Sequence, residues 1–244
     1  MTTKTSPLSG GDIPGGPHGY FTDREGPDTV PVAMSATLIE TLKDMEPNGP
    51  EQMHVLEMLG GALHACASLF EAPAPMEDKM IAVHNEIDSV IREDRRNPAR
   101  GAGEIKCRAG CGGCCSIPVS VSFSEAQMLV KTATKQNIPL DEGKLYRQSQ
   151  AVGDPAKWRE MSDEDRRCVF LSEENNCRVY EVRPAACRKY FSVTDPEFCN
   201  DKKYPGHPVG VWFLLRAEVI DSAAMTVFGA GHMAEQLIKA KRAP

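Results

Sequence analysis

The stretch Cys107-Arg-Ala-Gly-Cys111-Gly-Gly-Cys114-Cys115 places four cysteines within nine residues, with three glycines between them. Four further cysteines follow in the same part of the chain, at Cys168, Cys177, Cys187 and Cys199. Glycine lets the backbone turn tightly and lets amide groups approach sulfur. Thiols at this density, in a chain of otherwise ordinary composition, indicate metal ligands.

The overall composition excludes several classes of protein. The chain has 244 residues, of which 41% are hydrophobic and 25% charged, as in ordinary soluble proteins. Its net charge of −6 argues against nucleic-acid binding, which usually shows as a basic patch. The segment Met1–Asp12 lacks the pattern of a signal peptide, and the apolar run Val209–Leu215 is too short to span a bilayer. We therefore expect a cytoplasmic protein that binds neither nucleic acid nor membrane.

The expected compartment bears on the chemistry of the cysteines. Thiols stay reduced in the cytosol, so clustered cysteines there indicate metal ligands in preference to disulfides. A disulfide-bonded domain is the least favoured interpretation for a chain without an export signal. A protein partner stays open, and nothing in the sequence indicates the oligomeric state.

Composition and periodicity divide the chain into four segments. Residues 1–33 are rich in Gly, Pro, Ser and Thr and predict a disordered arm. Residues 34–100 predict a helical hairpin annex, and residues 101–205 the cysteine-cluster metal-binding domain. Residues 206–244 predict C-terminal helices that pack on the core. The predicted fold class is mainly α, with an irregular cysteine-rich region and a small β-hairpin.

Apolar residues at steps of three and four mark the helices of the annex. A helix after Pro50 places Val55, Leu59 and Cys66 on one face, and a second helix follows from Met76. Cys66 is interpreted as a small buried hydrophobic residue and is excluded from the metal site.

The second cysteine group predicts a hairpin followed by a helix. Two β-prone runs, beginning at Cys168 and Cys177, flank a polar Glu-Glu-Asn-Asn turn. Pro184 suits the first position of a short helix. Cys187 would lie in or near the first turn of that helix, where the helix dipole and nearby arginines favour a thiolate.

Other helix boundaries follow from capping signals. Ser124 is expected to cap a helix that runs to about Lys135. Near the C-terminus, we expect one helix over residues 209–220 and another that Ser222 caps and that runs to about Lys239.

The number of cysteines exceeds what one structural zinc needs, which is four ligands in a tetrahedron. The side chains of adjacent residues are expected to diverge, so Cys115 beside Cys114 indicates two neighbouring metal centres or one polynuclear cluster. Eight thiolates are enough for two four-thiolate sites, or for an iron–sulfur cluster with four cysteines and further thiols beside it. The candidate metal ligands are Cys107, Cys111, Cys114, Cys115, Cys168, Cys177, Cys187 and Cys199.

The joint spacing of these cysteines, with Cys177-Arg-Val-Tyr-Glu-Val-Arg-Pro-Ala-Ala-Cys187, resembles the CxxCxxCC cysteine-cluster family (the YkgJ-like family) over roughly residues 104–200. The family is described as zinc- or iron-chelating, some members are named as iron–sulfur proteins, and a related domain occurs in flagellin lysine N-methylases. Three residues rather than two separate Cys107 from Cys111, and Cys199 lies outside the most regular part of the pattern. The resemblance does not reach the first hundred residues.

Two functional hypotheses remain. The first is a metalloprotein with an iron–sulfur cluster or iron, acting in redox or protein-modification chemistry. The second is a non-catalytic scaffold or binding module stapled by zinc, which stabilises such domains by about 10 kcal/mol or more. Catalytic residues are not assigned, because the sequence has no His-Glu-x-x-His motif, no P-loop and no Gly-x-Gly-x-x-Gly fingerprint. Thiolates suit both metals.

Overall fold

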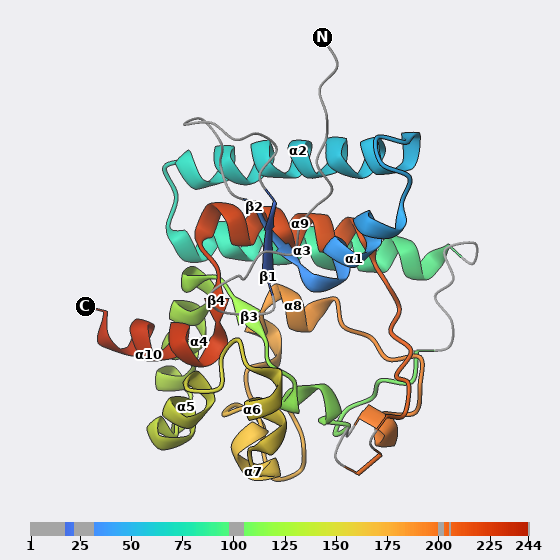
Figure 1. Cartoon of the computed structure of the whole chain (residues 1–244). Coiled ribbons are helices and arrows are strands. Elements are labelled where there is room, and N and C mark those ends of the chain that lie inside the picture. The colour runs from blue at the N-terminus through green and yellow to red at the C-terminus, as the bar shows by residue number, and fades with distance from the viewer. Residues whose placement is uncertain (1–17, 22–31, 98–104, 200–202, 205, 244) are drawn as a thin grey trace.

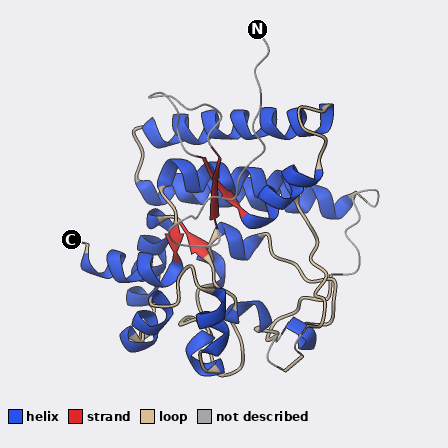
Figure 2. Ribbon diagram, in the orientation of Figure 1, coloured by secondary structure: helices blue, strands red, loops and turns tan. Residues whose placement is uncertain are grey.

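The computed structural model describes residues 18–21, 32–97, 105–199, 203–204 and 206–243. Helices make up most of this part of the chain, and its strands pair only as two-stranded sheets (Figure 2). The predicted fold class, mainly α with little strand, is confirmed. Most of the expected disordered arm lies outside the described residues; within it, β1 (His18–Phe21) pairs antiparallel with β2 (Val32–Ser35).

One half of the molecule is a stack of long helices. Helices α2 (Pro50–Glu71) and α3 (Met76–Arg96) come from the predicted annex, and α9 (Leu215–Phe228) packs against both (Figure 1). Helix α1 (Ala36–Asp44) also packs on α9. Pro50 begins α2, where its missing N–H costs no hydrogen bond. Cys66 faces inward and is buried, as expected for a small core residue.

Helix α2 is the outermost helix of this stack in Figure 1. By length and composition it could cross a membrane, and it is the one helix of the described residues that could. A single such helix is a weak indication, because core helices of soluble proteins pass the same test. The absence of membrane binding therefore stays a prediction.

The other half has its own hydrophobic cluster, formed around α4 (Phe123–Lys135), α5 (Glu142–Ser149) and α10 (Met233–Arg242). Strands β3 (Ser120–Val121) and β4 (Gly231–His232) lie just before α4 and α10 and pair antiparallel, which brings the first turns of these two helices together. Two short helices, α6 (Pro155–Glu160) and α7 (Asp163–Arg166), lead into the second cysteine group. The elements that carry the eight candidate cysteines lie below the long-helix stack in Figure 1.

Several predicted boundaries are wrong for local reasons. Ser122, not Ser124, caps α4, because its hydroxyl accepts from the amide of Glu125 while Glu125 bonds back to the amide of Ser122. Residues 209–214 are not helical, and Ser222 lies inside α9 rather than at a cap. The chain leaves α9 at Gly229, whose φ of 81° suits glycine, and His232 caps α10.

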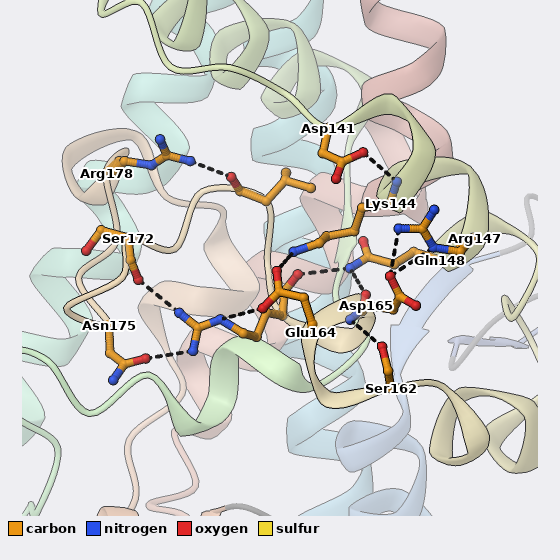
Figure 3. Close-up of polar contacts among 12 residues, drawn as sticks. Asp141, Lys144, Arg147, Gln148, Ser162, Glu164, Asp165, Ser172, Asn175 and Arg178 are labelled. Carbon is orange, nitrogen blue, oxygen red and sulfur yellow. Dashed lines mark hydrogen bonds and ion pairs between the residues drawn. The ribbon is translucent and has the colours of Figure 1, made fainter.

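The hairpin expected after Cys168 is reduced to a single antiparallel bridge, between Leu171 and Cys177. Arginine side chains bind backbone carbonyls beside the bridge: Arg178 Nη2 donates to Val169 O at 2.8 Å, and Arg167 Nη2 to Ser172 O at 2.9 Å (Figure 3). Figure 3 shows these contacts beside the ion pairs of α5 and α7. The turn is therefore fixed by these arginine side chains together with the short strand pairing, in which Ser172 N donates to Asn176 O and Arg178 N to Phe170 O, both at 2.9 Å.

A buried carboxylate on α9 makes the stability of the fold depend on pH. Asp221 Oδ2 lies 3.1 Å from Lys189 Nζ, and burial raises the pKa of Asp221 from 3.8 to about 6. The folded state therefore holds the Asp221 proton more tightly than the unfolded chain does. This group stabilises the fold below about pH 4, and that contribution is lost as pH rises towards and through 6.

Replacing Asp221 by asparagine is expected to remove this loss. Between pH 4 and 7, the free energy of unfolding of Asp221→Asn should rise relative to the wild type by on the order of 1–3 kcal/mol. Urea unfolding at several pH values, followed by circular dichroism, measures the difference. A pH-independent difference between the two proteins would contradict the assignment. Asp165→Asn, whose carboxylate pKa is lowered by Arg147, is a control of opposite sign.

Candidate metal centre

The first cysteine loop folds onto the turn that follows Cys168. Gly110 and Gly112 have φ values of 77° and 58°, which glycine adopts without strain. A Cβ on Gly112 would lie 2.9 Å from Asn175 Cβ, so this close approach also needs glycine. Cys168 N donates to Cys115 O at 2.7 Å. The two cysteine groups, far apart in sequence, are therefore parts of one site.

Short 3-10 helices bring the remaining thiols to this place. Cys114 and Cys115 lie on η2 (Gly113–Ser116), and Cys199 ends η4 (Pro196–Cys199), which packs on η2. A Cβ on Gly113 would lie 2.5 Å from Cys199 Cβ. The missing side chain at Gly113 therefore allows Cys199 to reach the first loop. This contact gives a role to a cysteine outside the most regular part of the sequence pattern.

Seven cysteines line one cavity of about 570 Å³. They come from the first cysteine loop (residues 107–115), from the segment around the turn that the Leu171–Cys177 bridge closes, and from helix α8 (Ala185–Arg188). The cysteines that line it are Cys107, Cys111, Cys114, Cys115, Cys168, Cys177 and Cys187. The eighth candidate, Cys199, lies behind Gly113 at the edge of the same site.

The electrostatic coupling among the thiols separates two groups. The pKa of Cys107 is raised by burial and by its neighbours Cys111, Cys114 and Cys199, and a backbone hydrogen bond from Ser192 opposes the shift. In the second group, burial raises the pKa of Cys168 to about 12, with smaller contributions from Cys177 and Cys114. Cys187 is coupled to the same second group. Cys114 therefore lies between the two groups.

The expected lowering of the thiol pKa values by arginines and the helix dipole is wrong for Cys177 and Cys187. Burial raises both pKa values, and the opposing contribution of Arg183 and Arg178 to Cys177 is smaller. The free-energy cost of removing a thiolate from water is larger here than the stabilisation that these cations provide. Without a metal ion, the site therefore favours neutral thiols, and metal binding must release protons.

The adjacent pair also differs from expectation. The thiol of Cys114 makes a hydrogen bond with that of Cys115, which is the main cause of the raised pKa of Cys114. The two side chains therefore converge rather than diverge, because two short side chains on neighbouring Cα atoms can both turn to one side. The pair can bind neighbouring parts of one centre.

The cysteines that line the cavity are ligands of a type that suits zinc or iron, and they lie in one place. Their side chains must move before they can bind one metal ion together. Among the described residues, no three His, Cys, Asp or Glu side chains form a group that could already hold a metal ion. The cysteines of the cavity must therefore turn towards a common point. Deprotonated thiolates are the donors that both metals accept.

Aromatic residues from distant segments complete the walls. Trp158 Nε1 donates to Ser116 O at 3.0 Å, which ties α6 to the end of η2, and His232 packs edge-on against Trp158. Tyr190 lines the cavity, and burial raises its pKa to about 12, so its hydroxyl stays protonated at neutral pH. Trp158 and His232 could not be assigned from sequence, because neither lies in a motif.

The contact between Gly113 and Cys199 yields a prediction. Gly113→Ala places a methyl group against Cys199, so we expect η4 to shift and the free energy of unfolding to fall by about 1–3 kcal/mol, with metal content reduced. Gly60→Ala is the control: nothing lies within 4 Å of the new methyl group, and alanine stabilises a helix interior by about 1 kcal/mol. Urea unfolding and metal analysis measure both. Equal effects of the two substitutions would contradict the contact.

The fold and the site define a class: a cysteine-rich metal-chelating region carried by a helical scaffold. Residues 106–204 match the model of the CxxCxxCC family, whose description is "Putative zinc- or iron-chelating domain". The family that the cysteine spacing indicated is thereby confirmed over these residues, and the match supports metal binding. No curated protein and no solved structure matches the chain.

Proposed function

We propose that the cysteine cavity binds an iron–sulfur cluster or iron, and that the chain acts in redox or protein-modification chemistry. One observation carries the proposal: seven thiols from three separate segments line a single cavity, which is more than one tetrahedral zinc needs. An iron–sulfur cluster, when bound, supplies one-electron redox chemistry through cysteine thiolates. The eight cysteines assigned above would hold it, with Cys114 and Cys115 between the two groups.

The protein residues around the cavity would control this chemistry. Trp158 and Phe170 lie in the wall and limit access of water to the thiolates. The protonated hydroxyl of Tyr190 is a hydrogen-bond donor inside the cavity. We place the protein in the cytoplasm, where thiols remain reduced.

A second candidate is a scaffold with two zinc ions and no reaction. The division of the thiols into two groups, with Cys114 between them, favours it. One group is Cys107, Cys111 and Cys199, and the other is Cys168, Cys177 and Cys187. Each group would supply three thiolates to one tetrahedral zinc ion, and Cys114 and Cys115 would supply the fourth ligand of the two ions.

Anaerobic purification, followed by metal and sulfide analysis and an absorption spectrum, tests these proposals. The first predicts a brown protein with iron; a cluster also yields acid-labile sulfide. A colourless protein with about two zinc ions per chain would overturn the first and support the second. A chain that binds neither metal after anaerobic reconstitution would overturn both.

A further inference from the structure

The short helix α8, which carries Cys187, is attached at its first residue to two long helices. Ala185 N donates to Glu125 Oε1 at 2.8 Å, and the same oxygen lies 2.9 Å from His84 Nε2. The other carboxylate oxygen accepts from Ser122 N at 2.8 Å. Glu125 and His84 are 2% and 3% exposed. One buried carboxylate on α4 therefore joins α3, α4 and the start of α8.

The other end of α8 is attached as firmly. Arg188 Nη1 lies 2.7 Å from Asp88 Oδ2 on α3. The next residue, Lys189, lies 2.5 Å from Glu218 and 3.1 Å from Asp221, both on α9. Arg188 and Lys189 are buried, so water does not screen these contacts as it would on the surface.

Stability alone does not account for these contacts. A helix of four residues is too short to be stable by itself, and burying charged pairs often stabilises a fold no more than apolar packing would. Such pairs do fix geometry, because each charged group must keep its partner. Their common effect is to hold α8, and with it Cys187, in one place and orientation.

These contacts also reach beyond the family-matched residues 106–204. His84 and Asp88 lie on α3, before the match, and Glu218 and Asp221 lie on α9, after it. The segments that the family pattern does not cover therefore touch the element that carries a candidate ligand.

We propose that Glu125, His84 and Asp88, with the α9 carboxylates, are positioning residues that fix Cys187 for metal binding, and that α3 and α9 serve the site in this way. The inference rests on the proposed metal-binding function. It gives a specific role to the helices outside the metal-chelating region, because they hold in place a ligand that the local chain cannot hold.

The test compares two acidic residues of the same helix. Asp88 pairs with Arg188 beside Cys187, whereas Glu93 pairs with Arg216 of α9 at 2.9 Å, away from α8. Asp88→Asn is expected to weaken metal affinity by about 10–100-fold, the usual effect of losing a partner that orients a ligand. Glu93→Gln should leave affinity within twofold of the wild type. Glu125→Gln should act as Asp88→Asn does.

Cobalt(II), titrated into the full-length metal-free protein without oxygen, is a suitable probe, because the sulfur-to-cobalt absorption reports thiolate ligation. The expected result for Asp88→Asn is a weaker affinity and a lower absorbance for each bound cobalt. Urea unfolding of the metal-free proteins shows separately whether each variant is folded. Unchanged affinity and absorbance in a folded Asp88→Asn variant would overturn the inference. If the wild type itself binds no metal, the proposed function fails and the inference falls with it.

Discussion

Cys114→Ser is expected to cause the largest loss of metal of any single substitution in this chain. Cys114 is the cysteine that couples to both thiol groups and bonds to Cys115. It raises the pKa of each of the following residues: Cys107, Cys168, Cys177, Cys187 and Cys199. A metal centre that binds cysteines of both groups would lack a shared ligand without the thiolate of Cys114. Metal content should therefore fall to a small fraction of the wild-type value, with soluble yield reduced as well.

The comparison with other cysteines makes this prediction specific. Cys111→Ser, Cys177→Ser and Cys187→Ser should also lose metal or solubility, each through one of the two groups. Cys66→Ser is the matched control, because Cys66 is buried in the long-helix stack and lines no part of the cavity. Metal analysis of each purified variant measures the effect. Loss of metal from Cys66→Ser, or full retention in Cys114→Ser, would contradict the assignment.

Removal of the metal is expected to release the cysteine loops while the two hydrophobic clusters stay folded. Residues 105–112 form no helix or strand, and hydrogen bonds to Ser192 attach only their first part, so we expect metal ligation to supply much of the stability of the loop. Structural metal sites contribute about 10–16 kcal/mol in small domains. The helix clusters have their own buried cores of apolar side chains, and of the eight candidate ligands only Cys168 and Cys177 are among the described residues that pack against them.

Limited trypsin digestion with and without a chelator measures this effect. Arg108 is exposed in the first loop, whereas Arg188 is buried on α8. In the chelated protein, cleavage after Arg108 should accelerate by at least tenfold, while the helical circular dichroism signal changes little. Equal digestion rates would show that the loop does not depend on metal. Complete loss of the helical signal would show that the two clusters depend on the metal as well.

Much of the helical architecture follows from the sequence for a physical reason. Proline at the start of α2, and apolar residues spaced three and four positions apart, favour helix through local preferences of the chain. These preferences do not depend on tertiary contacts. The cysteine spacing likewise predicted a metal-chelating region, because ligand type is encoded residue by residue. The assignment of the eight cysteines as ligands and the four-segment division stay predictions.

Some errors have local causes, as at the capping box of Ser122, and others arise where tertiary contacts override a local signal. The hairpin expected after Cys168 is a single bridge, and the side chains of Arg167 and Arg178 bind carbonyls beside it. The arginines near Cys187 do not lower its pKa, because burial depends on elements distant in sequence. This second effect cannot be read from neighbouring residues.

By itself, the sequence determined the kind of chemistry: clustered thiols separated by glycine, of a number and spacing that suit zinc or iron. Only the tertiary structure decided how the thiols are grouped, which residues wall the cavity and what holds Cys187. The reason is distance along the chain. Glu125 meets Ala185 across 60 residues, and Asp88 meets Arg188 across 100. Such contacts depend on how whole helices pack, which no local pattern encodes.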